Sequence, residues 1–169
     1  EDVLRRRETS PTYPLGKLAN DDYWFKYIYP KNLTMFNEEK LITPYLSLGS
    51  QFSFDPDGDF YTNTKCFGLI KYPNIAKSYK FYLSILNSKL MWFFIKNTSS
   101  VMTGGYYTFT KDSLSPFPLP ETVNIKDIES LEKLVEKIFE NKKLKIDTEN
   151  LECQVNKLVF ELYGLNDEE

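Results

Sequence analysis

The sequence predicts an α+β fold: a small, twisted, mainly antiparallel sheet packed with a central amphipathic helix, followed by a C-terminal antiparallel helical hairpin. Three observations predict this class. Short aromatic or β-branched runs, separated by Pro and Gly, indicate strands in the first half of the chain. A long apolar stripe with helical spacing follows them. Two further amphipathic segments come after a proline-rich stretch, Ser115–Pro120.

The strands are expected in the first seventy residues. The turn Asp55–Asp59 contains Pro and Gly and predicts a hairpin between the runs on either side. A calcium loop is rejected there, because Gly58 is the fourth residue and Cys66 the twelfth, whereas an EF-hand needs Gly at six and Glu at twelve. The expected strands are Tyr23–Tyr29, Leu41–Pro44, Gln51–Phe54, Phe60–Asn63 and Thr64–Lys71, with Pro44 at an edge or strand end.

The helices are predicted from apolar spacing. Asn74 is the expected cap of one helix from about residue 75 to residue 96, which buries Tyr79, Tyr82, Leu83, Leu86, Leu90, Phe93 and Phe94 and turns Ser84 and Ser88 to other faces. The C-terminal hairpin carries two stripes, Ile128–Phe139 and Leu151–Leu162, with Asp147 as the expected cap of its second helix.

Three segments are expected along the chain. Residues 1–20 are a polar linker or arm, 21–120 a globular domain, and 121–169 the helical hairpin, which acts as a spacer or docking element. The chain begins at Glu1, without a methionine and in the middle of a sequence pattern, so we expect a fragment of a longer protein. No apolar run is long enough to span a membrane, and Cys66 and Cys153 are not spaced as a metal site, which predicts a cytoplasmic protein without a membrane partner.

The net charge of −3 hides an uneven distribution. Residues 1–120 hold 14 Lys and Arg against 11 Asp and Glu, whereas residues 121–169 hold 7 against 13. A mildly basic globular part therefore precedes an acidic tail.

The stretch Phe60–Lys111 contains 52 residues without Asp or Glu, yet it carries seven lysines and thirteen aromatic residues. Excluding carboxylates while keeping lysines favours a surface that faces a polyanion, and aromatic rings add faces that stack on bases. The alternative is chance combined with a buried element, since buried elements lack acids in any case.

The chemistry of catalysis is missing. The chain has no His and no glycine-rich nucleotide loop, and no Asn-Pro-Pro-Tyr or Asp-Pro-Pro-Tyr run for methylating an adenine. A metal-dependent nuclease needs Pro-Asp followed by Asp/Glu-x-Lys. Pro56-Asp57 is present, but the acid-free stretch that follows supplies no such partner, and Glu38-x-Lys40 lies upstream, in the wrong order. We expect neither catalysis nor a metal site in this chain.

Taken in order, several runs carry a family resemblance that begins at about residue 13. They are Tyr23–Leu33, Lys40–Pro44, Phe54–Tyr61, Tyr82–Phe93, Gly104–Tyr107 with Phe117–Pro120, and Leu162–Leu165. Together they resemble the TaqI-like C-terminal specificity domain, the target-recognition module of adenine-modifying DNA methyltransferases and of fused type II restriction–modification enzymes. The Leu-Asn-Ser-Lys-Leu run and the Gly-Gly-Tyr to Pro-x-Pro run are the more specific motifs.

The resemblance implies a bacterial module that binds duplex DNA and positions an upstream methyltransferase domain, which would use S-adenosylmethionine. Lysines of the acid-free stretch are then expected to hold phosphates: Lys65, Lys71, Lys77, Lys80, Lys96 and Lys111. Side chains on and near a loop loosened by two glycines are expected to approach base edges: Asn97, Thr103, Gly104, Gly105, Tyr106, Tyr107 and Thr108.

Alternatives stay open for these residues and for the whole chain. Tyr106 and Tyr107 are also compatible with a core position, and Asn97 with the C-cap of a helix. The chain is also compatible with a separate specificity subunit, or with a protein-interaction module that makes no DNA contact.

Overall fold

The computed structural model describes residues 1–28 and 32–166, and the chain forms two compact units, Glu1–Met35 and Phe36–Glu169. Compact units need not coincide with functional segments, so the boundaries expected near residues 20 and 120 stay predictions. In the first unit, α1 (Asp2–Arg5) is followed by turns that two arginines hold together. Arg5 donates to the carbonyl of Ala19 at 2.9 Å, and Arg7 to the carbonyls of Trp24 and Lys26, both at 3.0 Å.

The predicted strand Tyr23–Tyr29 is wrong where the structure describes it. Residues 23–28 form turns and bends, while Tyr29, Pro30 and Lys31 lie outside the described residues. A strand needs a neighbour for its backbone groups. Here local partners satisfy them instead, since the N–H of Lys26 donates to the carbonyl of Tyr23 at 2.8 Å and the Arg7 guanidinium binds two nearby carbonyls.

The second unit is built on a three-stranded antiparallel sheet. β1 (Lys40–Pro44) lies between β3 (Ser53–Asp55) and β4 (Cys66–Leu69). A second, two-stranded sheet pairs β2 (Leu46–Ser47) with β5 (Tyr107–Thr108). The strands expected at Leu41–Pro44 and within Thr64–Lys71 are confirmed. Pro44 is the last residue of β1, where its missing N–H interrupts the ladder least.

The expected hairpin across Asp55–Asp59 is half right. β3 is present, but residues 60–63 form no strand, and β3 pairs with β1 instead. The Asp55 carboxylate accepts hydrogen bonds from the N–H groups of Asp59 and Phe60, both at 3.1 Å, which curls the chain away from β3. Gly58 has φ +70°, and a Cβ there would lie 2.3 Å from the carbonyl oxygen of Asn37, so the turn packs closely against the 3₁₀ helix η1 (Leu33–Asn37).

The single helix predicted over residues 75–96 is two helices, α2 (Tyr79–Leu86) and α3 (Lys89–Thr98). Each begins at a serine cap: Ser78 accepts the N–H of Phe81, and Ser88 accepts the N–H of Met91, both at 3.2 Å. Asn74 is therefore not the cap. The break also changes which side chains are buried, because Ser84 and Ser88 lie in the interior and Phe93 is exposed.

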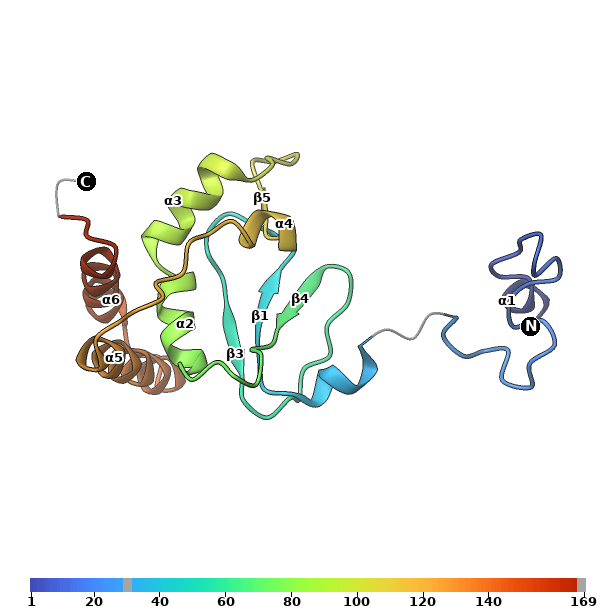
Figure 1. The fold of residues 1–169 in the computed structure, drawn as a ribbon, viewed down its shortest axis with the longest axis horizontal. Helices are drawn as coiled ribbons and strands as arrows, with labels where there is room; N and C mark the ends of the chain where they lie inside the picture. Colours follow the sequence, from blue (N-terminus) through green and yellow to red (C-terminus); the bar gives the residue numbers. More distant parts are fainter. Residues whose placement is uncertain (29–31, 167–169) are drawn as a thin grey trace. The chain divides into compact units, whose positions relative to one another are not determined.

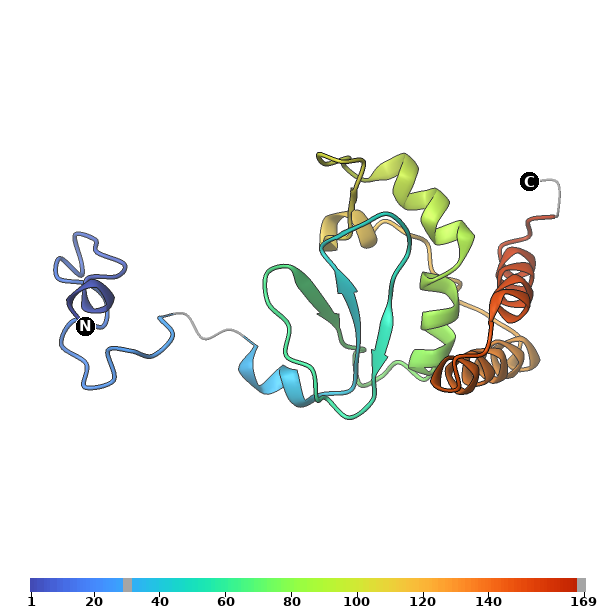
Figure 2. The ribbon, with the colours of Figure 1, turned by 180° about the vertical axis from the view of Figure 1, so that it is seen from behind.

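The C-terminal hairpin consists of α5 (Ile125–Lys143) and α6 (Glu149–Leu162). α2 packs between the sheet and these two helices, as both ribbon views show (Figures 1 and 2). Thr148 is the N-cap residue of α6, one position after the predicted Asp147, whose carboxylate accepts the N–H of Glu149 at 3.2 Å. The buried stripe of the hairpin is Leu131, Val135, Val155 and Val159. The predicted α+β class is confirmed.

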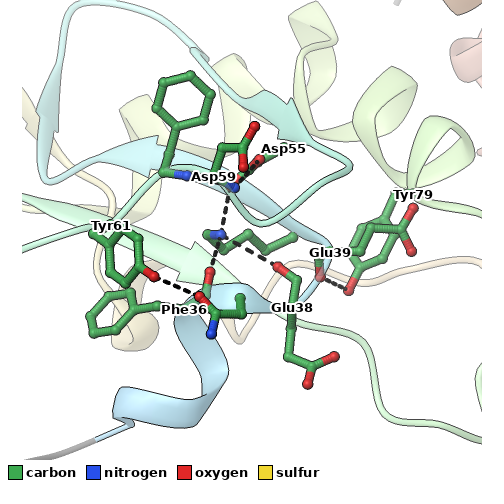
Figure 3. A network of polar contacts seen from close by, with 10 residues as sticks. Phe36, Glu38, Glu39, Asp55, Asp59, Tyr61 and Tyr79 are labelled. Atoms are coloured by element: carbon green, nitrogen blue, oxygen red, sulfur yellow. Dashed lines mark hydrogen bonds and ion pairs between the residues drawn. The ribbon is translucent and has the colours of Figure 1, made fainter.

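A buried ion pair joins β1 to β3. Lys40 and Asp55 are partners in the ladder, their side chains are each 2% exposed, and Lys40 Nζ lies 2.6 Å from Asp55 Oδ2. The ammonium also donates to the carbonyl of Phe36 at 2.7 Å and to that of Glu38 at 3.3 Å. Figure 3 shows Phe36 and Glu38 on one side of this network and Asp55 on the other. The three ammonium donors of Lys40 thus have three acceptors.

The same contacts set the protonation of Asp55. Burial by itself raises the pKa of a carboxyl group, because it disfavours the charged form. Hydrogen bonds from Lys40 and from the N–H groups of Phe60 and Asp59 outweigh burial, so the pKa of Asp55 lies below its ordinary value. The carboxylate is therefore held in its charged form inside the fold.

We expect Lys40→Met to lower the free energy of unfolding by about 3–5 kcal/mol, because it leaves a buried carboxylate without its cation. Lys40→Met combined with Asp55→Leu is expected to cost less than the sum of the two single changes. Lys137→Met, at an exposed position of α5, is the control and should stay within about 0.5 kcal/mol of the wild type. Urea unfolding of the wild type, the two single variants, the double variant and the control measures these effects; additive single effects would contradict a coupled pair.

Asp55 should also make the free energy of unfolding depend on pH in the acid range. A lowered folded pKa stabilises the protein fully above the unfolded pKa of about 3.9, and this contribution is lost as the pH falls below that value towards the folded pKa. Asp55→Asn removes the titration, so its free energy of unfolding should fall less steeply than that of the wild type below about pH 5. Parallel acid limbs in urea titrations at several pH values would show that Asp55 does not contribute.

Candidate nucleic-acid interface

The fold places the predicted site residues at two opposite ends of the sheet. β4 separates Lys65 from Lys71, and six residues of extended chain span about 20 Å. Lys65 lies at the end where β1 finishes, because its carbonyl accepts the N–H of Tyr45 at 2.9 Å. Lys71 lies at the other end, because its N–H donates to the hydroxyl of Tyr79 at 2.9 Å. We call these the β5 end and the Tyr79 end.

The Tyr79 end comprises Lys71, Lys77 and Lys80, and all three ammonium groups have partners within the protein. Lys71 donates to the carbonyl of Lys77 at 2.7 Å, and Lys77 to that of Pro120 at 2.6 Å. Lys80 forms an ion pair with Glu136 of α5 at 2.6 Å. These contacts fasten the start of α2 to the C-terminal segment, so these lysines have a structural role whether or not they meet a phosphate.

The β5 end comprises Lys65, Lys96, Asn97, residues 103–108 and Lys111. It is held together by β2 pairing with β5 and by the N–H of Phe109, which donates to the carbonyl of Tyr45 at 2.9 Å. Lys65, Lys96 and Lys111 are exposed. The ammonium of Lys65 lies 5.5 Å from the ring centroid of Tyr45. The structure thus brings three of the six predicted lysines to the same end as all the residues predicted to approach bases.

A glycine hairpin, Val101–Tyr107, projects from this end. The N–H of Met102 donates to the carbonyl of Tyr106 at 2.7 Å, and Val101 and Tyr107 form a β-bridge. Gly104 and Gly105 have φ of +84° and +79°, a conformation that side-chain-bearing residues rarely adopt. The two glycines were predicted to loosen this loop; in the structure, their positive φ angles form a defined tight turn.

The base of the hairpin lies inside the fold. Thr108 is buried, and its hydroxyl lies 2.9 Å from that of Ser99 and 3.2 Å from that of Ser113. Tyr107 is half-buried, with its ring edge-on to Trp92 at 5.2 Å between centroids. Thr103, Gly104, Gly105 and Tyr106 are exposed, as is Asn97 on α3. Tyr107 and Thr108 are therefore anchors, and the tip residues are the ones that face outward.

Charge is distributed unequally between the two ends. No acid occurs from Phe60 to Lys111, which covers most of the β5 end, and the first acid beyond it is Asp112 in α4 (Lys111–Leu114). The Tyr79 end carries Glu39 and Glu136 as well as the buried Asp55. Within the described residues, no group of acids and cysteines is arranged to hold a metal ion, and no helix is both long and apolar enough to cross a membrane.

A family model for the TaqI-like C-terminal specificity domain matches residues 16–119. The chain belongs to this family. The match confirms the resemblance found in the sequence, and it supports a DNA-recognition role of the kind such domains have in restriction–modification enzymes; a specificity domain is not itself catalytic. No curated protein matched the chain.

The Leu-Asn-Ser-Lys-Leu motif of this TaqI-like domain has a structural role. It forms the break between α2 and α3, and Asn87 holds that break against the strand side of the fold. Its side-chain oxygen accepts the N–H of Phe52 at 2.8 Å, and its side-chain nitrogen donates to the carbonyl of Phe52 at 2.9 Å. An Asn followed by a Ser that can cap a helix is a signal for such a break, and the unbroken apolar stripe obscured it.

The TaqI-like match ends at residue 119, yet residues beyond it support α3. Asn156 of α6 accepts the first N–H of α3, that of Lys89, at 2.6 Å. Phe117 lies between Phe94 and Tyr163, with ring centroids 5.1 and 5.9 Å apart. The Tyr163 hydroxyl donates to the carbonyl of Pro118 at 2.8 Å, and burial raises the pKa of Tyr163 to about 12. These positioning residues were not among the predicted site residues.

We expect Asn87→Ala to destabilise the TaqI-like domain by about 1–3 kcal/mol, because it leaves both backbone groups of Phe52 without their partner. Asn74→Ala is the matched control. Replacing an N-cap residue by Ala lowers the free energy of unfolding by about 1 kcal/mol, whereas the same change at an exposed loop residue alters it by less than about 0.5 kcal/mol. Because Asn74 is an exposed loop residue, we expect the smaller effect. Urea unfolding measures both; equal effects would contradict the helix boundary described above.

Proposed function

We propose that this specificity domain binds duplex DNA with its β5 end and directs an adenine methyltransferase domain of the same protein to its target. One observation carries the proposal: exposed lysines and an exposed glycine hairpin gather at an end of the sheet that is poor in acids, while the lysines of the opposite end have internal partners. A polyanion is the ligand that such an end attracts and that the acid-bearing end repels.

The residues of the β5 end divide into two roles. Lys65, Lys96 and Lys111 contact phosphates and give affinity and register without sequence choice. Asn97 and the hairpin residues Thr103 and Tyr106 approach base edges, where amide and hydroxyl groups distinguish base pairs by donor and acceptor pattern. Because Thr108 is buried and bonded to Ser99, it takes no part in this contact.

The partner domain completes the proposed enzyme. It carries the catalytic residues and binds S-adenosylmethionine, with or without a fused endonuclease, and acts on DNA in a bacterial cytoplasm. The specificity domain contributes the position of that chemistry on the duplex, since its own residues bind and orient. Support for this arrangement comes from the family, whose domains serve restriction–modification enzymes.

We expect Lys96→Glu and Lys111→Glu each to weaken binding to duplexes of any sequence and to reduce the slope of log affinity against log salt by about 1. Lys137→Glu is the matched control, an exposed lysine of α5 that should leave affinity and slope unchanged apart from a small long-range effect. Fluorescence anisotropy over a series of salt concentrations measures these quantities. Equal losses in all three variants would indicate a response to net charge, and no loss at Lys96 and Lys111 would remove the β5 end from the interface.

A further inference from the structure

We infer that the glycine hairpin is an apolar wedge that enters the base stack of duplex DNA beside the phosphates held by the lysines. This inference rests on the proposed function and deepens it, because it names what the tip of the hairpin contacts. Its starting point is an exposed group of apolar side chains on a projecting turn: Val101 is 59% exposed, and Met102 and Tyr106 are each 41% exposed.

Two backbone hydrogen bonds close the hairpin, and its exposed apolar side chains lie on either side of the exposed turn Thr103-Gly104-Gly105. The N–H of Met102 is paired with the carbonyl of Tyr106, and the N–H of Gly105 donates to the carbonyl of Met102 at 3.1 Å. A Cβ added at Gly105 would meet nothing within 4 Å, so this glycine is required for its positive φ and not for space. The turn is thus narrow at its glycines and apolar on either side of them.

The hairpin is also held in place before any partner arrives. The Tyr107 ring packs on Trp92 of α3, and Thr108 is fixed by Ser99 through hydrogen bonds between their hydroxyls and from the Thr108 N–H at 3.1 Å. A contact surface that is already ordered loses little conformational entropy on binding. A projection that is anchored at its base and carries apolar side chains beside its glycine turn can act as a wedge.

Charge selects DNA as the occupant. The charged residues nearest in sequence to the hairpin are both lysines, Lys96 before it and Lys111 after it. The sequence from Phe60 to Lys111 contains no acid. A ligand that is anionic outside and apolar within matches a tip flanked by cations, and the duplex has phosphates outside and stacked bases within. Methionine and other apolar side chains that insert between base steps unstack them and kink the duplex.

The test compares two duplexes of the same sequence, one fully paired and one with a central abasic site. A wedge binds the abasic duplex more tightly, because part of the cost of unstacking has already been met. We expect the whole chain to prefer the abasic duplex by about tenfold, which corresponds to about 1.4 kcal/mol. Met102→Ser with Tyr106→Ser should abolish this preference and leave the salt slope unchanged, since both side chains are exposed and uncharged.

Two controls separate the wedge from other effects. Leu144→Ser, at an exposed apolar position between α5 and α6, should keep the preference. Lys96→Glu should weaken binding to both duplexes equally and keep their ratio. Thermal unfolding verifies that each variant is folded.

Each contrary result has its own meaning. Equal affinity of the wild type for the two duplexes, or a preference that survives the double serine change, overturns the wedge and leaves the proposed function intact. A wild-type chain that binds neither duplex but binds a protein partner through the hairpin overturns both.

Discussion

The buried ion pair between Lys40 and Asp55 is the constraint around which the sheet is arranged. Lys40 gathers carbonyl oxygens from the segment before β1, and Asp55 gathers N–H groups from the turn after β3. One ion pair therefore fixes the entry to the central strand and the exit from an edge strand. The pair lies at the Tyr79 end of the sheet, whereas the exposed Lys65, Lys96 and Lys111 lie at the β5 end.

The two ends of the sheet differ in the contacts that their lysines make within the fold. The Tyr79 end is occupied by contacts that join α2 to α5 and to the proline-rich segment, as the ion pair between Lys80 and Glu136 illustrates. The β5 end has its internal hydrogen bonds at Thr108 and Tyr45, beneath the surface, and presents lysines and the glycine hairpin outward. Lysines that look equivalent in the sequence therefore differ in exposure and in internal partners according to the end of the sheet at which they lie.

Sequence periodicity was sufficient for elements whose stabilising partners are apolar and numerous. α5 and α6 were predicted near their observed positions because their buried residues repeat at the spacing of a helix, and β1 was predicted as a short extended run that ends at Pro44. The break between α2 and α3 was missed because the apolar stripe continues across the local Asn-Ser signal, and because the contact that holds the break, Asn87 with Phe52, joins residues 35 positions apart. The separation of Lys65 from Lys71 follows from the strand expected between them, whereas the placement of Lys96 and Lys111 near Lys65 depends on the pairing of β2 with β5, which a single sequence does not reveal. The aromatic run Tyr23–Ile28 was misjudged because contacts of Arg7 replace a strand ladder.

The support that α6 gives to α3 bears on how recognition can be moved from one enzyme to another. The segment that matches the family ends at residue 119, whereas Asn156 holds the first turn of α3 and Tyr163 closes the ring stack behind it. A transplant cut at the end of the matched segment would carry the glycine hairpin and its lysines but leave behind the residues that aim the helix next to them. The structural unit that supports α3 is therefore longer than the segment matched by the family model.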